Sequence, residues 1–416
     1  MTEVRPFRAY RYTPRAGRLD DLVTQPYDKI TREMQAAYLE RSPYNLVRIV
    51  LGPRSEQDSP DDNVYTRAAR YFQEWLQAGI LAQDPEPAFY VYSQEFTLHE
   101  GSERLTRVGF IGLGPVVDYS QGIVFRHERT LNEPKRDRLE LLHHTRAHFE
   151  SIFVLYPDPD CTVERVLQRF LEQPPLASAV DEYGTLNRIW RVVDPEACRA
   201  IQQAMRDKKL LIADGHHRYE TALAFAKEHP ELDAARFAMM TFVNLYSPGL
   251  RILATHRVLR GRAPSSIDAL RKAISGLGRL RWGLRLEELR SLLERPDSEL
   301  VRIGLTWWDQ QGLGLLEAPR SGDQLDLEFL HNQILAGLLG LNEQLVAEAQ
   351  PIEYVRGIAE AIELVRSGAA WAAFLLPPVG VDDVARIAFK GGLMPQKSTD
   401  FYPKLLSGLT IYRLES

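Results

Sequence analysis

Apolar and polar residues follow one another along the chain at two different spacings, and these spacings predict its helices and strands. Residues 63–80 repeat apolar side chains at helical spacing, and the apolar runs 88–98 and 105–113 flank Glu100-Gly101-Ser102 as a hairpin. Further strands are predicted at 45–51, 151–156, 186–193, 209–213, 237–244, 252–258 and 371–376. Further helices are predicted at 135–149, 163–172, 195–206, 216–229, 267–275, 286–294, 326–339 and 355–367.

Strands and helices succeed one another throughout, which predicts an α/β protein of the α+β kind, with helices packed on mixed sheets. An N-terminal α/β region at 1–150 contains a charged loop, and a second α/β region follows at 151–262. Residues 263–325 have the pattern of a small α+β insertion, and 326–416 form a C-terminal region.

Composition excludes several classes of protein. The 416 residues carry a formal net charge of −5, so the chain lacks the broad positive charge that drives nonspecific nucleic-acid binding. No apolar run approaches the ~20 residues that span a bilayer, and residues 1–10 lack the apolar core of a signal peptide. Cys161 and Cys198 form neither a metal-type pair nor a disulfide framework. We therefore expect a cytoplasmic protein that acts on small molecules, without a membrane partner; its oligomeric state is left open.

The strongest chemical signal is the segment 210–222, in which an apolar strand runs through Asp214 and Gly215 into a helix. The first turn of a helix offers unpaired N–H donors and partial positive charge, which suit a phosphate group. Asp214 is a candidate ligand for Mg²⁺ or a partner that orients a histidine. Three side chains add charge and proton-transfer capacity at this turn: His216, His217 and Arg218. The alternative is an ordinary helix start that Asp214 caps, with the basic side chains in solvent.

A second group of charges lies between two apolar elements, at 126–138. Glu128 is our candidate for a general base or a metal ligand, because neighbouring basic side chains tune a carboxylate electrostatically. Arg126, His127 and Lys135 are candidate phosphate ligands. A solvated surface loop explains the same charges, and the sequence leaves both interpretations open.

A third candidate segment lies near the C-terminus, at 390–409. Its glycines precede Lys397, Ser398 and Thr399, which supply one cation and two hydroxyls for a phosphate or carboxylate, although the spacing of a Walker A loop is absent. Lys404 and Asp28 are candidate substrate contacts. The alternatives are a C-terminal loop that docks on the core and, for Asp28, a residue at a helix entrance.

Three histidines fall on the helix predicted at 135–149: His143, His144 and His148. His144 and His148 have the i, i+4 spacing of a metal pair. The glutamate of a His-Glu-x-x-His motif is missing between them, and no cysteine is near in sequence. We interpret all three as surface or core histidines.

Together these motifs resemble one broad bacterial and archaeal family of unknown function. The resemblance rests on Ala213–Ala222, on Arg126-His127-Glu128 and on Met394–Lys404, and it runs from Pro26-Tyr27-Asp28 almost to the C-terminus. The turn Asp214–Arg218 is also similar to the phosphate-binding turn of the ParB/sulfiredoxin superfamily, especially of nucleotide-dependent free-serine kinases, which carry the same Asp-Gly-His-His. This second resemblance implies a ParB/sulfiredoxin-like core with large additions, and a nucleotide phosphate held at the turn.

The resemblance implies a phosphotransferase that uses ATP or ADP with Mg²⁺ and acts on a small hydroxylated metabolite, with serine or phosphoserine the first to test. Asp214 and Glu128 would hold the metal, and Glu128 would accept the hydroxyl proton, with His216 and His217 as further catalytic residues. Residues 126–128 and 394–404 are expected to form the other walls of the site. Two alternatives stay open: a nucleotide-binding switch protein of the ParB kind, and a metabolite phosphatase that uses the same phosphate site.

Overall fold

The chain forms two compact units, each an α/β structure, which confirms the predicted fold class. The computed structural model describes residues 1–98, 102–128, 132–261, 263–264, 266–295, 297–308, 312–341, 351–395 and 397–415, without the side chains of 132–134. Unit 1 comprises Met1–Arg251, Ala385–Gly392 and Pro403–Ser416, and unit 2 comprises Ile252–Val384 and Leu393–Tyr402. The predicted boundaries after residues 150 and 325 therefore lie inside unit 1 and inside unit 2.

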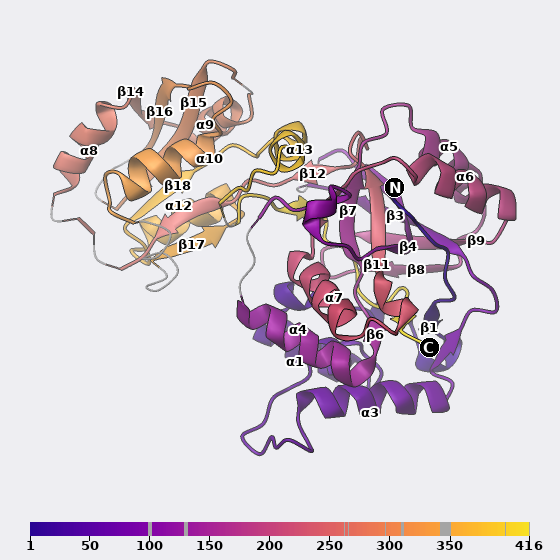
Figure 1. Cartoon of the computed structure of the whole chain (residues 1–416). Helices are drawn as coiled ribbons and strands as arrows, with labels where there is room; N and C mark the ends of the chain where they lie inside the picture. The colour runs from indigo at the N-terminus through magenta and orange to yellow at the C-terminus, as the bar shows by residue number, and fades with distance from the viewer. Residues whose placement is uncertain are drawn as a thin grey trace. The chain divides into compact units, whose positions relative to one another are not determined.

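Unit 1 is built on an eight-stranded mixed sheet with the strand order β5-β10-β7-β11-β4-β3-β9-β8 (Figure 1). The strands are β3 (Phe89–Phe96), β4 (Leu105–Pro115), β5 (Val124–Phe125), β7 (Ile152–Tyr156), β8 (Ala177–Val180), β9 (Leu186–Val192), β10 (Leu210–Asp214) and β11 (Phe237–Asn244). β10 runs parallel to β5 and antiparallel to β7. Every residue of β7 and β11 is buried, so both faces of the sheet are covered at its centre.

The helices of unit 1 begin where the sequence supplies caps. The side chain of Asn63 accepts hydrogen bonds from the first turn of α3, and Asp194 caps α6, whose first residue is Pro195. The helices are α1 (Arg32–Arg41), α2 (Val47–Val50), α3 (Val64–Gln77), α4 (Asn132–Thr145), α5 (Thr162–Leu171), α6 (Pro195–Met205) and α7 (His216–Glu228). Two short strand pairs complete the unit, β1 (Tyr10–Tyr12) with β2 (Leu81–Gln83) and β6 (Ala147–His148) with β20 (Tyr412–Arg413).

Unit 2 contains a six-stranded antiparallel sheet with the order β14-β16-β15-β18-β13-β17. The strands are β13 (His256–Leu259), β14 (Arg279–Leu284), β15 (Leu300–Trp307), β16 (Leu313–Pro319), β17 (Ile352–Val355) and β18 (Ala372–Leu375). The helices are α8 (Ile267–Ser275), α9 (Leu286–Leu293), α10 (Asp326–Phe329), the π-helix η6 (Leu330–Ala336) and α12 (Ile358–Arg366). The chain passes between the units at β12 (Arg251–Ile252), α13 (Val381–Phe389) and β19 (Phe401–Tyr402).

Three sequence predictions need correction. Residues 45–51 contain the one-turn helix α2 instead of a strand, because the Asn45 side chain accepts a hydrogen bond from the Val47 N–H and starts a helical turn. The helix predicted at 135–149 ends at Thr145, and Arg146 takes a left-handed φ of 49°. The strand predicted at 252–258 is divided into β12 and β13. The hairpin of β3 and β4 is confirmed, but its turn at residues 99–101 lies outside the described residues.

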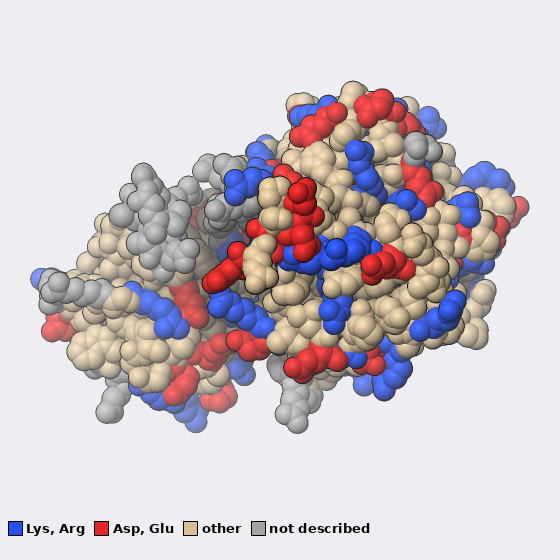
Figure 2. Space-filling view, turned by 90° about the horizontal axis from the view of Figure 1, so that it is seen from below, with Lys and Arg blue, Asp and Glu red and all other residues tan. Residues whose placement is uncertain are grey.

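Among the described residues, no helix is both long enough and apolar enough to cross a membrane. Basic and acidic side chains are interspersed over the described part of the face seen in Figure 2. Charge on that face therefore changes sign over short distances, which weakens its long-range attraction for a polyanion.

Candidate functional site

The segment 210–218 forms the expected strand–turn–helix. β10 ends at Asp214, Gly215 takes a φ of 92°, and α7 begins at His216 without a side-chain cap. A left-handed φ of this size favours glycine, and a Cβ at Gly215 would lie 3.0 Å from the Arg218 guanidinium. Because Asp214 does not cap α7, the alternative of an ordinary capped helix does not hold. The N-cap residue Gly215 has no side chain that could accept hydrogen bonds from the N–H groups of the first turn.

The Asp214 carboxylate lies between two buried cations. Lys404 donates a hydrogen bond to Oδ1 over 3.1 Å, and Arg218 donates to Oδ2 over 2.8 Å. Both cations are more than nine-tenths buried. Burial raises the pKa of Asp214, but the charges of Lys404, Arg218 and Lys29 outweigh this effect and hold the pKa well below its ordinary value. The carboxylate therefore stays ionised and fixes the positions of two cations beside the turn.

Arg218 also joins this turn to the start of β7 and to residues 27–28. Its Nη1 donates to the carbonyl of Ser151 over 2.5 Å. The neighbouring Glu150 is buried and accepts a hydrogen bond from the Tyr27 N–H over 2.9 Å. Burial lowers the pKa of Arg218, but the charges of Glu150, Asp214 and Asp28 raise it above its ordinary value. The exposed Asp28 thus lies within electrostatic reach of Arg218, and its role as a substrate contact stays a prediction.

Two buried histidines pack edge to face beside the turn. The ring centroids of His127 and His216 are 4.7 Å apart, and His127 Nδ1 lies 2.9 Å from the carbonyl oxygen of Ile212. That carbonyl can only accept, so Nδ1 carries the proton in the neutral His127 ring. Burial lowers the pKa of His127, and burial together with the charge of His127 lowers the pKa of His216 well below its ordinary value. Both rings are therefore neutral near pH 7, and His216 does not supply the positive charge that the sequence suggested.

The Nε2 atom of His216 is buried and has no hydrogen-bond partner among the described residues. A buried polar atom without a partner costs about 1–3 kcal/mol relative to one that is satisfied. A ligand that bonds to this atom would remove the cost. The adjacent His217 is half-buried, and its charge contributes to the low pKa of His216.

Glu220 on α7 pairs with two cations of the segment 126–138, Arg126 and Lys135. Arg126 lies 3.0 Å and Lys135 2.9 Å from its two carboxylate oxygens, and the Arg126 guanidinium also lies over the ring of Tyr119. Sequence reasoning treated these cations as phosphate ligands and did not single out Glu220. Glu128 is half-buried, and its charge raises the pKa of the adjacent His127.

The C-terminal motif is divided between the units. Lys404 belongs to unit 1, whereas Lys397, Ser398 and Thr399 belong to unit 2. Within unit 2 the carbonyl of Lys397 accepts a hydrogen bond from Arg257 over 3.2 Å, and the Ser398 hydroxyl donates to the carbonyl of Pro395. A role for residues 397–399 as a wall of the site at Gly215 stays a prediction.

Two buried polar side chains that sequence reasoning missed anchor the segment that carries Lys404. Gln94 donates to the Lys404 carbonyl over 2.8 Å, and Arg107 donates to the Pro403 carbonyl over 2.5 Å and to Gln94. Burial lowers the pKa of Arg107 to about 10. Gln94 and Arg107 both lie within predicted strands, and this signal was available in the sequence, because a polar residue that a strand buries needs a buried partner.

The fold and this turn define a two-unit α/β protein with a glycine turn that suits an anion. Residues 4–326 match the family described as Protein of unknown function (DUF1015), and the chain belongs to this family. The family resemblance drawn from the motifs is therefore confirmed. Among curated proteins, none matches the chain.

Solved structures give weak similarities. A free serine kinase in complex with AMP is 13% identical, with 70% of this chain and 88% of that chain covered and a TM-score of 0.38. A conserved hypothetical protein from Pyrococcus furiosus is also 13% identical, with 70% and 92% covered and a TM-score of 0.36. SbnI from Staphylococcus aureus, with a C-terminal truncation, is 11% identical, with 73% and 87% covered and a TM-score of 0.35. Similarity of this degree supports no conclusion about function, and a ParB/sulfiredoxin-like core stays a prediction.

Proposed function

We propose that this protein is a nucleotide-dependent phosphotransferase that acts on a small hydroxylated metabolite, with serine as acceptor or phosphoserine as donor. ATP or ADP is its phosphoryl partner. The proposal of serine rests on the Asp-Gly-His-His sequence at 214–217, which resembles that of free-serine kinases.

One observation carries the proposal: the start of α7 at Gly215, which has no side-chain cap, stands next to the buried Nε2 of His216, which has no hydrogen-bond partner among the described residues. A phosphoryl oxygen accepts hydrogen bonds from helix N-terminal N–H groups and from a neutral imidazole that carries its proton on Nε2. A phosphate bound there would satisfy both sets of donors. An apolar ligand would satisfy neither.

Charge near the turn also supports an anionic ligand. Asp214 holds the cations Arg218 and Lys404 in fixed positions, and Lys29 lies within electrostatic reach of the same carboxylate. Phosphoryl transfer depends mainly on positioning and on neutralising spread negative charge, both of which fixed cations supply. In this proposal Asp214 is a positioning residue.

The residues around Asp214 fit a directly bound Mg²⁺ poorly. Both of its carboxylate oxygens accept hydrogen bonds from cations, and two fixed positive charges oppose a divalent cation at the same carboxylate. Mg²⁺ commonly binds nucleotide phosphates and retains several waters, so it would enter with the nucleotide. We therefore withdraw Asp214 as a metal ligand and derive no step through an ion bound there.

Glu128 is the proposed general base. The charge of its carboxylate raises the pKa of His127, and the His127 ring packs edge to face on His216. The proposed base therefore belongs to the residue next to the ring that contacts His216. Glu128 would accept the proton of the acceptor hydroxyl while the hydroxyl oxygen attacks the γ-phosphorus of ATP. The bond between that phosphorus and the bridging oxygen breaks, and ADP leaves with the electron pair.

The test is to incubate the full chain with radiolabelled serine, Mg²⁺ and either ATP or ADP, and to detect phosphoserine by chromatography. We expect phosphoserine from the unaltered chain and a loss of roughly 10²–10³-fold in turnover in His216→Phe, which keeps a ring but removes the Nε2 donor. Lys227→Ala is the matched control, because Lys227 lies on the same helix with its side chain 63% exposed. Full activity in His216→Phe would refute the proposed role of the turn.

Measuring free phosphate in the same incubations separates transfer from hydrolysis. Phosphate released at the same rate with and without serine, and no phosphoserine, would replace the phosphotransferase with a phosphatase that uses the same residues. Inactivity across a panel of hydroxylated metabolites, beside an active control kinase, would contradict both functions.

A further inference from the structure

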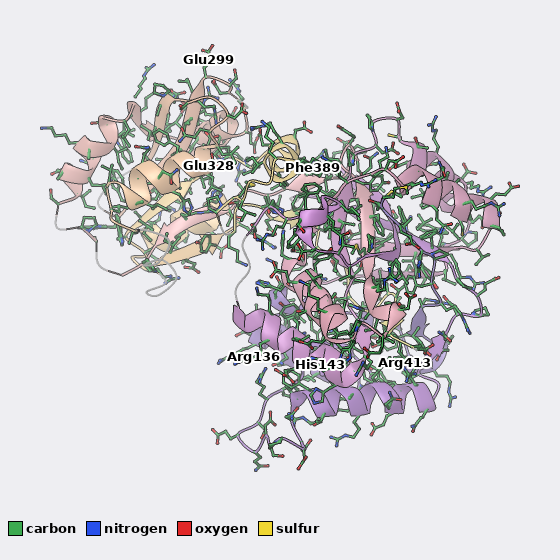
Figure 3. The ribbon with its side chains drawn as sticks, in the orientation of Figure 1. Arg136, His143, Glu299, Glu328, Phe389 and Arg413 are labelled. Carbon is green, nitrogen blue, oxygen red and sulfur yellow. The ribbon has the colours of Figure 1, made fainter. Side chains whose placement is uncertain are left out.

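Helix α7 carries a second group of potential ligands at its C-terminal end, away from Gly215. The group consists of His143 on α4, Glu228 at the last position of α7, and His229 immediately after it. One ligand atom from each lies within 4.8 Å of the other two. Figure 3 labels His143 on α4, and its Nε2 lies 2.9 Å from the Glu228 carboxylate.

We propose that His143, Glu228 and His229 bind a divalent transition-metal ion, of the Zn²⁺ type, that links α4 to α7. Two imidazoles and one carboxylate form a ligand set that zinc accepts, and water or another ligand can take the fourth position. Two ligand atoms at about 2.1 Å from a tetrahedral zinc ion lie about 3.4 Å apart. Side-chain rotations that shift the ligand atoms by about an ångström would therefore close the site.

The state of His229 supports this site independently of the spacing. Its Nδ1 lies 3.3 Å from the Glu231 carboxylate, which can only accept, so Nδ1 carries the proton. Its Nε2 is buried and has no hydrogen-bond partner among the described residues. A histidine that binds a metal typically donates its other ring N–H to a carboxylate, and His229 already has this arrangement.

The position at the end of α7 also favours a cation. The last carbonyl groups of a helix carry partial negative charge, and an acidic residue such as Glu228 is unfavourable there on its own. Glu231 adds a second carboxylate nearby, whereas the Arg146 guanidinium lies over the ring of Phe225 and offsets one of these charges. A bound divalent ion would neutralise the negative charge that remains at this end of the helix.

The side chains are open enough for an ion to enter. His143 is 31% exposed, Glu228 48% and His229 21%. The sequence did not indicate this site because His143 lies 85 positions before Glu228 and 86 before His229. His144 and His148, which have the i, i+4 spacing of a metal pair in the sequence, do not share a helix, since α4 ends at Thr145 and His148 lies in β6.

The experiment uses the full chain without an affinity tag, freed of metal by a chelator and desalted. Zn²⁺ is added, unbound metal is removed by gel filtration, and bound zinc is counted by mass spectrometry. Affinity is measured by competition with a chromophoric chelator, and Co²⁺ replaces Zn²⁺ to report coordination by visible absorption. We expect one zinc per chain and a cobalt spectrum typical of tetrahedral coordination.

Variants assign the ion to these residues. His143→Ala and His229→Ala should each weaken Zn²⁺ binding by more than tenfold, and Glu231→Gln by roughly tenfold or more, because it removes the partner of His229. His144→Ala is the matched control: it removes an adjacent imidazole that is bonded to the Glu140 carbonyl, and zinc affinity should not change.

Two outcomes would overturn the proposal: no zinc retained after gel filtration, or equal retention by the unaltered chain and both histidine variants. Far-UV circular dichroism without metal checks that each variant folds. If an alanine variant unfolds, His143→Gln and His229→Gln keep a polar side chain of similar size and answer the same question. Phosphotransfer is not part of this assay, so its result is independent of the proposed function.

Discussion

The two ends of α7 carry the same residue type in opposite surroundings. At the start of the helix, His216 packs against His127, and Asp214 just before it holds the cations Arg218 and Lys404. At the end, His229 lies near His143 and two carboxylates. The helix dipole has the matching sign at each end, positive at the start and negative at the finish. Histidine itself therefore does not indicate the ligand; the charges around it favour an anion at one end and a cation at the other.

The largest effect should come from breaking the ion network at the start of α7. Arg218→Ala would leave Oδ2 of Asp214 and the Ser151 carbonyl without their buried donor, and should lower the free energy of unfolding by about 3–5 kcal/mol. Unfolding in denaturant measures this value. The control is the exposed Lys227 on the same helix: Lys227→Ala should change the free energy of unfolding by no more than about 0.5 kcal/mol. Equal effects in the two variants would remove the distinction between a buried network and a surface charge.

At the other end of the helix, removal of metal should have the next largest effect. An ion present at a hundred times its dissociation constant stabilises the folded chain by about 2.7 kcal/mol, so excess chelator should lower the melting temperature. The chelator should have no effect on His143→Ala. A melting temperature that chelator leaves unchanged in the unaltered chain would contradict stabilisation of this end by metal.

The turn before α7 gives a smaller effect that separates backbone strain from side-chain contact. Gly215→Ala forces a left-handed φ on alanine and places its Cβ 3.0 Å from the Arg218 guanidinium. Gly122→Ala has a similar φ of 65° but meets nothing within 4 Å, so it should show only the backbone cost of about 1–2 kcal/mol. The excess in Gly215→Ala, measured by thermal unfolding, reports the contact with Arg218. An equal loss in both variants would mean that the contact does not matter.

Acid should weaken the start of α7 gradually. The pKa values of His127 and His216 are lower in the folded chain than in the unfolded chain, so the unfolded chain binds more protons below about pH 6.5. Each histidine should then lower the free energy of unfolding by about 1.4 kcal/mol for each pH unit, from about pH 6.5 down to the pKa of that histidine in the folded chain. Unfolding in denaturant at pH 7 and pH 5, with chelator present, measures the loss. His216→Phe should show a shallower dependence on pH; an unchanged slope would contradict the low pKa.

Sequence patterns predicted elements well where burial is simple. The run 237–244 is apolar except for Thr241 and Asn244 and forms β11 with the same bounds, because a central strand is covered on both faces. The run 45–51 is apolar except for Asn45 and Arg48 but contains a helical turn, since so short a run fits a buried helix as well as a strand. Unit 2 combines strands from 256 to 375 in one sheet, an arrangement that local patterns do not specify.

The candidate site was predicted only as far as its residues are neighbours in the chain. Asp214, Gly215 and His216 lie where the motif placed them. The partners of Arg126 and Lys135 were not predictable, because spacing along the chain does not reveal that Glu220 faces both cations. The neutral state of His216 depends on burial by distant elements, and the charge expected from its residue type was wrong for that reason.

The hydrogen bond between Asp214 and Lys404 joins residues that are 190 positions apart. Synthesis proceeds from the N-terminus, and domains tend to fold as they emerge from the ribosome. Residues 252–384, most of unit 2, are therefore made after the turn at Gly215 and before its lysine. A nascent chain has Asp214 and Arg218 in place but lacks the second cation until residues 403–407 have been translated. The order of synthesis thus separates the assembly of the sheet from the completion of the site, and truncated translation products that stop before Lys404 carry the turn in an incomplete form.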